Sequence, residues 1–169
     1  LTPILSAKFN PYPNKDLREN SRIIDYSNIF SLDRLSANET VEGGESITIG
    51  NEYKIFNNNN SNDEVFGLSL ATSFRRDENE DLPSNSYLGQ TTSNIVGQMN
   101  LKTNEFIEFG YDFASDNNLG QMNYHKIDTT FKINNFITSF KFIEENHAIG
   151  NESFVSNETS YSFNANNNI

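Results

Sequence analysis

Hydrophobic and polar residues alternate strictly along short stretches of this chain, and polar, Asn-rich segments separate the stretches. In one of them, apolar residues stand at positions 47, 49, 53 and 55, while polar or small residues stand at 48, 50, 52 and 54. A period of two places successive side chains on opposite sides of an extended chain, so it predicts a strand with one apolar face. The pattern recurs to the end of the chain.

Eight segments alternate in this way, and none shows a helical period. We predict strands at Leu1–Phe9, Glu45–Phe56, Val65–Arg75, Asn94–Lys102, Glu105–Ala114, Gln121–Ile133, Phe136–Glu144 and Phe154–Ala165. Only Thr103-Asn104 and Asn134-Asn135 separate two of the neighbouring pairs, which is typical of two-residue hairpins. A change of parity within the sixth segment predicts a bulge near His125. The predicted fold class is all-β, antiparallel and up-and-down.

Short and long connections alternate along the chain. Residues 10–41, 77–93, 115–119 and 145–153 form the longer loops, and 57–64, 103–104 and 134–135 the shorter turns. Outer-membrane barrels combine short periplasmic turns with longer external loops, and their tilted strands are about ten residues long. Aromatic residues near both ends of the apolar faces resemble interfacial girdles. These are Phe66, Phe131, Phe136 and Phe163 toward the turns, and Phe9, Phe74, Phe113 and Phe142 toward the loops.

Charged residues fall on the opposite faces of the same strands. A charge facing lipid at mid-bilayer costs about 2–4 kcal/mol, so this segregation predicts a wet interior. The residues expected to face a lumen include Glu52, Lys54, Glu108, Asp112, Lys126 and Asp128. We therefore predict one domain over residues 1–169, an incomplete part of a larger transmembrane β-barrel. A soluble β-sandwich also alternates, and it remains the structural alternative.

Composition narrows the function classes. The net charge of -11 argues against nucleic-acid binding, which needs a basic surface to neutralise phosphates. The absence of Cys excludes disulfides, Cys-ligated zinc and thiol chemistry within these residues. No run of 18 apolar residues exists, so no transmembrane helix is predicted. The first and last segments look cut from something longer, and we expect the chain to be a fragment.

The stretch NIFSLDRLSANETVEGG, which begins at Asn28, resembles a pattern in the barrel domain of the lipopolysaccharide-assembly outer-membrane family (LptD, organic solvent tolerance protein). That pattern is of the type N-[LI]-F-x-x-x-R-[FL]-x-G-x-D-R-x-E-G-G, followed by a strand with a Gly. Matching positions are Asn28, Ile29, Phe30, Arg34, Leu35, Glu42, Gly43, Gly44 and Gly50. The chain departs from the pattern at Ala37, at Glu39-Thr40 and at Ser46, which puts the ion pairing of the loop in question.

The resemblance implies a role in lipopolysaccharide export. Members of this family receive lipopolysaccharide from a periplasmic bridge protein and release it into the outer leaflet, and a lipoprotein partner plugs their barrel. The implied partners are therefore lipopolysaccharide, the plug lipoprotein, the bridge proteins and the lipid of the outer membrane. The implied location is the outer membrane of a Gram-negative bacterium. The chain would be a middle section of the barrel, without the periplasmic jellyroll.

The sequence gives weaker evidence for enzymatic or metal-binding chemistry. His125 and His147 are the two histidines, and Asp128 and Ser139 lie near His125 in the predicted sheet. No nucleophile motif accompanies them, so His125 is interpreted as an incidental polar residue near a loop or bulge. The acidic run 77–81 lacks the spacing and the Gly of a calcium loop, and a solvated loop is favoured. We expect no metal, no cofactor and no enzymatic activity. Alternatives are a porin-like passive channel, another outer-membrane barrel such as an enzyme, and a soluble carbohydrate-binding β-sandwich.

Overall fold

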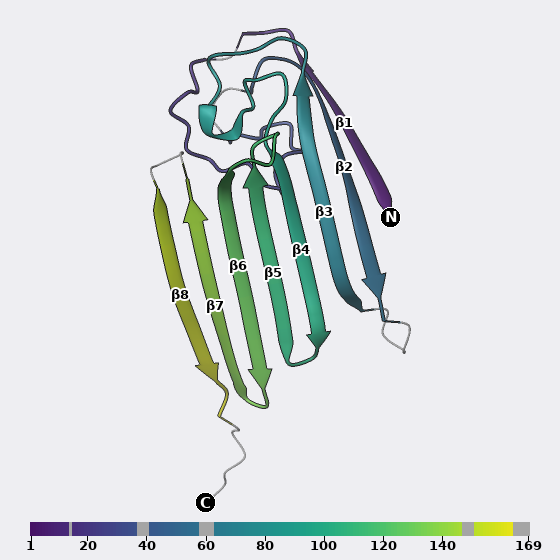
Figure 1. Ribbon diagram of the computed structural model, residues 1–169, viewed down its shortest axis with the longest axis vertical. Coiled ribbons are helices and arrows are strands. Elements are labelled where there is room, and N and C mark those ends of the chain that lie inside the picture. Colours follow the sequence, from purple (N-terminus) through teal and green to yellow (C-terminus); the bar gives the residue numbers. More distant parts are fainter. Residues whose placement is uncertain (14, 37–40, 58–62, 147–150, 164–169) are drawn as a thin grey trace, which may run out of the picture.

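Eight strands form a single antiparallel sheet in the part of the chain that the structure describes (Figure 1). The structure is a computed structural model, and it describes residues 1–13, 15–36, 41–57, 63–146 and 151–163. The strands are β1 (Thr2–Asn10), β2 (Gly44–Phe56), β3 (Glu64–Arg75), β4 (Ile95–Asn104), β5 (Ile107–Ser115), β6 (Met122–Ile133), β7 (Phe136–Glu145) and β8 (Glu152–Tyr161). Each strand pairs with its sequence neighbours, and β1 and β8 are the edges of an open sheet.

The predicted all-β, up-and-down fold is confirmed. Predicted and observed strands agree within two residues, apart from the C-terminal end of the last strand. That strand was expected to reach Ala165, which lies outside the described residues, and β8 ends at Tyr161. The Asn134-Asn135 turn is also confirmed, with Asn134 at a φ of 53°, a left-handed conformation that Asn tolerates better than most residues.

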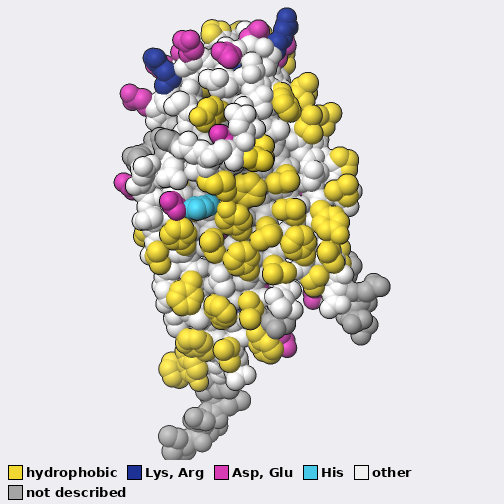
Figure 2. All heavy atoms as spheres, viewed as in Figure 1, with side chains coloured by type: hydrophobic (Ala, Val, Ile, Leu, Met, Phe, Trp, Pro, Cys, Tyr) yellow, Lys and Arg dark blue, Asp and Glu magenta, His cyan; other side chains and the backbone are white. Residues whose placement is uncertain are grey.

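The register gives the sheet two chemically distinct faces. Ile47 lies between Ala7 and Phe74, and farther along the sheet Tyr111 lies between Met99 and Ile127. We call this side the apolar face, and Figure 2 shows its hydrophobic side chains as a broad band below the charged loops. Many of its large side chains, among them Ile47, Phe74 and Phe140, are solvent-exposed, which is unusual for so many apolar groups on one surface. The opposite side, called the polar face, carries most of the charged residues of the strands, and Glu45 and Glu144 at the loop end of the apolar face are exceptions.

One predicted turn is wrong. The chain reverses at Glu105-Phe106 and not at Thr103-Asn104. A turn at Thr103-Asn104 would have placed Met99 opposite Glu108, because a shift by an odd number of residues exchanges the faces of a strand. In the structure Met99 pairs with Tyr111, and an irregularity after Lys102 absorbs the difference. Matching of the apolar faces therefore decides where this hairpin turns.

The predicted bulge near His125 is confirmed, and the extra residue is Asn123. Tyr124 pairs with Ala114, but Met122 pairs with Ser115, which leaves Asn123 without a counterpart on β5. Asn123 is buried and its amide donates to Asn94 Oδ1 at 3.2 Å. The bulge returns Met122 to the apolar face, while Tyr124 stays on the polar face beneath the loops.

The hydrophobic core lies between the long loops and the polar face, at the end of the sheet where those loops gather (Figure 1). Loop residues Ile24, Ile29, Leu35, Leu82 and Leu88 pack there against residues of β3 to β6: Ala71, Val96, Ala114 and Tyr124. We call this end the loop end, and the opposite one the turn end. No second sheet is present among the described residues, which excludes the β-sandwich alternative. No helix in the described part of the chain has the length and hydrophobicity needed to cross a bilayer.

Of the aromatic residues expected at the two ends of the apolar face, all but Phe163 lie on that face in the register. Phe9, Phe74, Phe113 and Phe142 occupy its loop end, and Phe66, Phe131 and Phe136 its turn end. Phe163 lies beyond the end of β8, where its ring meets Tyr161 edge-on at 4.8 Å between centroids. The apolar face thus carries rings at both margins.

Candidate functional site

Residues 28–36 and 41–44 fold back over the polar face of β1, β2 and β3 at the loop end, and we call these two stretches the anchor segment. Asn28 sets its start. The Asn28 amide donates to the carbonyl of Ile23 at 2.9 Å, and its Oδ1 accepts from the backbone N–H of Asp25 at 3.2 Å. Leu35 is buried in the core, and its carbonyl accepts from Asn20 at 3.2 Å. Buried polar and apolar contacts together hold the segment on the sheet.

A ring-on-glycine contact docks the middle of the anchor segment. The Phe30 ring lies so close to Gly50 of β2 that a Cβ at that position would lie 2.7 Å from Phe30 Cζ. Only glycine leaves this approach open. Tyr26 packs edge-on against Phe30 at 5.7 Å between centroids, and the Tyr26 hydroxyl donates to Glu52 Oε1 at 3.3 Å. The matching Phe30 and Gly50 of the sequence pattern are therefore direct partners.

A buried ionic cluster closes the anchor segment. Arg34 is 1% exposed, and its guanidinium donates hydrogen bonds to both carboxylate oxygens of Glu42. The same guanidinium donates to Ser73 Oγ at 2.7 Å and to Ser46 Oγ at 3.0 Å, so it reaches β3 and β2 together. Two-pronged binding of a carboxylate by a guanidinium is among the strongest hydrogen-bonding arrangements in proteins. It joins two positions of the motif, Arg34 and Glu42, to two strands.

Two further cations from the strands meet Glu42. Lys8 Nζ of β1 lies 3.1 Å from Glu42 Oε1, and Arg75 Nη2 of β3 lies 3.4 Å from it. Arg75 also donates to the carbonyl of Gly43 at 2.7 Å and to that of Leu88 at 3.0 Å. Glu42 thus contacts side chains of β1 and β3 directly, and through Arg34 and Arg75 the same group also reaches Ser46 of β2 and the loop at Leu88. We call Lys8, Arg34, Glu42 and Arg75 the ionic cluster.

Gly44 gives Arg75 the room to reach the cluster. Its φ is +89°, a conformation that L side chains rarely adopt, and a Cβ there would lie 2.7 Å from Arg75 Nη1. Gly43 contributes its carbonyl and Gly44 its missing side chain. The two glycines after Glu42 thus have separate structural roles.

Electrostatics keep Glu42 ionised. Burial by itself would raise the pKa of Glu42, but the charges of Arg34 and Lys8 and their hydrogen bonds outweigh burial and hold that pKa below its ordinary value. The cluster carries three cationic side chains and one carboxylate within a chain of net charge -11. Removing the carboxylate would leave three buried cations facing one another.

Sequence reasoning found part of this site. The positions matched to the family pattern, Asn28, Phe30, Arg34, Leu35, Glu42, Gly43, Gly44 and Gly50, all lie in the anchor segment or directly beneath it. It missed Lys8, Ser73 and the role of Arg75. The one signal in the sequence for these three residues was that their positions fall on the polar faces of their strands. Ser46, a departure from the pattern, accepts a hydrogen bond from Arg34. The departures at Ala37 and Glu39-Thr40 lie outside the described residues.

The residues predicted to face a lumen all lie on the polar face, where they form ion pairs within and between strands. Lys126 Nζ lies 2.8 Å from Asp112 and 3.0 Å from Asp128. Glu108 accepts from Lys132 at 2.7 Å, and Glu52 lies 3.4 Å from Lys54. Opposite charges on the same strand or on neighbouring strands pair with one another and keep this part of the face hydrophilic.

His125 lies on the other side of the sheet from the serine that was weighed as its partner. Its ring lies 2.7 Å from Glu144 on the apolar face, whereas Ser139 pairs with Thr130 on the polar face. No Ser–His pair therefore forms between these two residues. His147 lies outside the described residues. Within the described part, no group of three or more His, Asp or Glu side chains is arranged to hold a metal ion.

Comparison with known proteins gave one match. The family model LptD, described as LPS transport system D, matches residues 2–166. Neither the curated proteins nor the solved structures gave a match. The matched range covers all eight strands and the whole anchor segment.

Proposed function

This chain belongs to the LptD family, LPS transport system D, and from that premise we propose that its sheet is a section of the wall of an outer-membrane barrel. The family is a non-enzymatic transport component that assembles lipopolysaccharide in the outer membrane of Gram-negative bacteria. In our proposal residues 1–169 form one part of that barrel. The apolar face contacts lipid, the polar face borders the hydrated lumen, and the loop end faces outward.

The segregation of the two faces carries this proposal. Ile47, Ile49, Phe140 and Val155 on the apolar face are between 49% and 70% exposed. Water is a poor environment for so much apolar surface, and a bilayer is a good one. The ion-paired residues of the opposite face would be destabilising in contact with lipid and are well solvated in contact with water. One sheet with these two faces suits a boundary between lipid and an aqueous path.

We propose that the charged residues of the polar face border the lumen. Glu52, Lys54, Glu108, Asp112, Lys126 and Asp128 lie on the part of the polar face that the hydrophobic core does not cover, on the turn side of the core residues Ala71, Ala114 and Tyr124. A lipopolysaccharide head group is sugar-rich and charged, and a hydrated, ion-paired surface matches its chemistry. We propose that this uncovered half borders the head-group path and contacts the plug lipoprotein. The periplasmic bridge proteins would deliver lipopolysaccharide from the turn end.

Single-cysteine labelling of the full-length protein tests the orientation of the faces. Asp128→Cys on the polar face and Ile127→Cys beside it on the apolar face differ by one residue and by the face they occupy. A membrane-impermeant maleimide should label the Asp128 variant of the purified barrel in liposomes and leave the Ile127 variant unlabelled. Equal labelling of the two positions would refute the lipid–lumen assignment. Charge reversal at Lys126 that leaves co-purification of the plug unchanged would refute that contact.

A further inference from the structure

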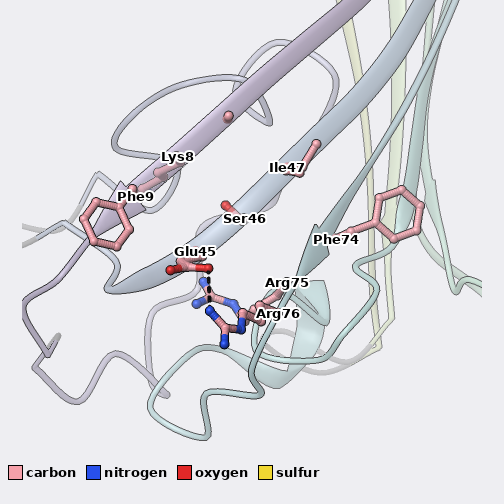
Figure 3. A pocket seen from close by; sticks show the side chains of 9 residues that line it. Lys8, Phe9, Glu45, Ser46, Ile47, Phe74, Arg75 and Arg76 are labelled. Carbon is pink, nitrogen blue, oxygen red and sulfur yellow. Dashed lines mark hydrogen bonds and ion pairs between the residues drawn. The ribbon is translucent and has the colours of Figure 1, made fainter.

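Two adjoining polar hollows lie at the loop end of β5, β6 and β7, between the edges of the sheet. The groove at Ile47 between Phe9 and Phe74 (Figure 3) instead opens along β1, the edge strand. The inner hollow is a cavity of about 20 Å³, and the outer one has a volume of about 300 Å³. Asn85 and Asn123 line both, so the small cavity borders directly on the larger hollow.

Hydrogen bonds from asparagine amides build the walls of the inner cavity. Asn123 Nδ2 donates to Asn94 Oδ1 at 3.2 Å, and Asn94 Nδ2 donates to the carbonyl of Asn85 at 3.0 Å. Asn146 Nδ2 donates to the carbonyl of Met122 at 3.1 Å. These bonds tie the loop before β4 to the bulge of β6 and to the end of β7, so the cavity has a fixed frame.

Two oxygen atoms of residues that line this cavity lack a hydrogen-bond donor. Asn85 Oδ1 and Glu145 Oε1 are shielded from solvent, and neither accepts a hydrogen bond from the described part of the chain. A buried acceptor without a donor is destabilising. An occupant that interacts with both oxygens would remove this cost.

The charge of Glu145 favours a cationic occupant over a neutral one. Glu145 forms no ion pair with the residues that the structure describes, and Glu152 of β8 stands directly opposite it across the strand pair. Like charges opposite one another destabilise a sheet. A water molecule would satisfy the oxygens and leave this repulsion in place, whereas a cation offsets both carboxylates.

The ligand atoms and the space indicate which cation fits. Carboxylate and amide oxygens suit hard divalent cations, and no described His lines the cavity to favour a softer metal. The cavity has room for about one water-sized species. Mg²⁺ usually keeps several of its waters in a strict octahedron, whereas Ca²⁺ accepts protein oxygens in flexible geometry. Waters in the outer hollow can complete the roughly six to eight ligands of Ca²⁺.

We propose that the inner cavity binds one calcium ion between Asn85 and Glu145. Asn85 Oδ1 and Glu145 Oε1 are ligands, and Glu152 balances the charge of the ion. The ion links the loop before β4 to the end of β7. This site departs from the expectation of no metal, because its ligands come from segments that no local spacing connects. It is separate from the acidic run 77–81 and does not depend on which way the loop end faces.

Calcium-dependent protection of the loop tests the site in the full-length protein with its plug partner. Hydrogen exchange of residues 84–94 is compared in Ca²⁺ and in EGTA, in detergent. Ca²⁺ alone should slow this exchange, with half-saturation at about 10⁻⁴–10⁻³ M, the range of extracellular calcium modules. Mg²⁺ at the same concentrations should leave it unchanged.

Glu145→Gln and Glu144→Gln form a matched pair of variants. Each exchanges one carboxylate for an amide of the same shape, but Glu144 lies on the apolar face, 2.7 Å from His125. Glu145→Gln should raise the half-saturating Ca²⁺ concentration about tenfold or more, because calcium affinity depends on the number of charged ligands. Glu144→Gln should stay within about twofold of the parent. Asn85→Leu keeps the volume, removes the oxygen and should act like Glu145→Gln.

Three results would overturn the calcium site. These are equal exchange in Ca²⁺ and EGTA, equal protection by Mg²⁺, and equal effects of Glu145→Gln and Glu144→Gln. The first would leave the cavity to water. The other two would mean that divalent ions act elsewhere, for instance on lipid phosphates, since ions bound there would not distinguish the two adjacent carboxylates.

Discussion

The ionic cluster predicts that one carboxylate holds the anchor segment on the sheet. Glu42→Gln keeps the shape of the side chain and removes its charge. Lys8, Arg34 and Arg75, all within ion-pair distance of Glu42, would then face one another without a counter-charge. Breaking a buried ion pair by removing one partner typically costs about 3–5 kcal/mol. The loss should fall on the docking of the anchor segment, because the strands keep their own hydrogen bonds.

Native-state proteolysis of the full-length protein measures this loss. Residues 23–35 comprise the start of the anchor segment and the five residues before it, and Ile24, Ile29 and Leu35 are buried among them. Cleavage within this range requires that part of the chain to leave the polar face. When opening is fast relative to cleavage, the cleavage rate follows the population of the open form. A loss of about 3 kcal/mol corresponds to roughly a hundredfold faster cleavage. Mass spectrometry of the fragments assigns the cut sites.

Glu45→Gln is the matched control. Glu45 lies three residues away and pairs with Arg76 at 3.3 Å, but both side chains are well exposed, 47% and 71%. An exposed pair of this kind contributes about 0–1 kcal/mol, so cleavage should rise by less than roughly fivefold. If the two variants accelerate cleavage alike, or if Glu42→Gln has no effect, the cluster does not anchor the segment.

Three further outcomes are expected. Since the pKa of Glu42 is lowered on folding, the stability that this carboxylate contributes is present above the ordinary value of 4.5 and is lost as pH falls through the folded pKa. Opening of the anchor segment, measured as a loss of hydrogen-exchange protection, should therefore increase only below pH 4.5. Gly50→Val should displace the ring packed on it and destabilise docking by about 1–3 kcal/mol, whereas Gly110→Ala, with 3.7 Å of clearance, should not; cleavage within 23–35 reports both. Phe140→Arg places a charge on the apolar face and should cost about 2–4 kcal/mol in urea unfolding from liposomes, against little for the neighbouring Ser139→Arg on the polar face; equal costs would contradict the face assignment.

The sequence by itself determined the sheet and its two faces. Side-chain parity is a local property, because an extended chain alternates sides whatever surrounds it, so the opposite placement of Phe140 and Ser139 follows from their order in the chain. The same parity, applied across the whole sheet, overruled the short-range turn signal at Thr103-Asn104 and moved the reversal to Glu105-Phe106. Long-range matching of faces outweighs local turn preference.

Only the tertiary structure decided which residues form the ionic cluster and which side chains become neighbours across the strands. Glu42 is 33 residues from Arg75 along the chain, Lys8 is farther still from both of them in sequence, and no local pattern connects the three. They meet because the anchor segment folds over the polar face. Burial there removes competing water, so each cation is stabilised by its ion pair with Glu42. Likewise, Ala7 is an ordinary strand residue until β2 and β3 place Ile47 and Phe74 beside it. Contacts between distant segments depend on register and loop packing, and these are properties of the folded sheet.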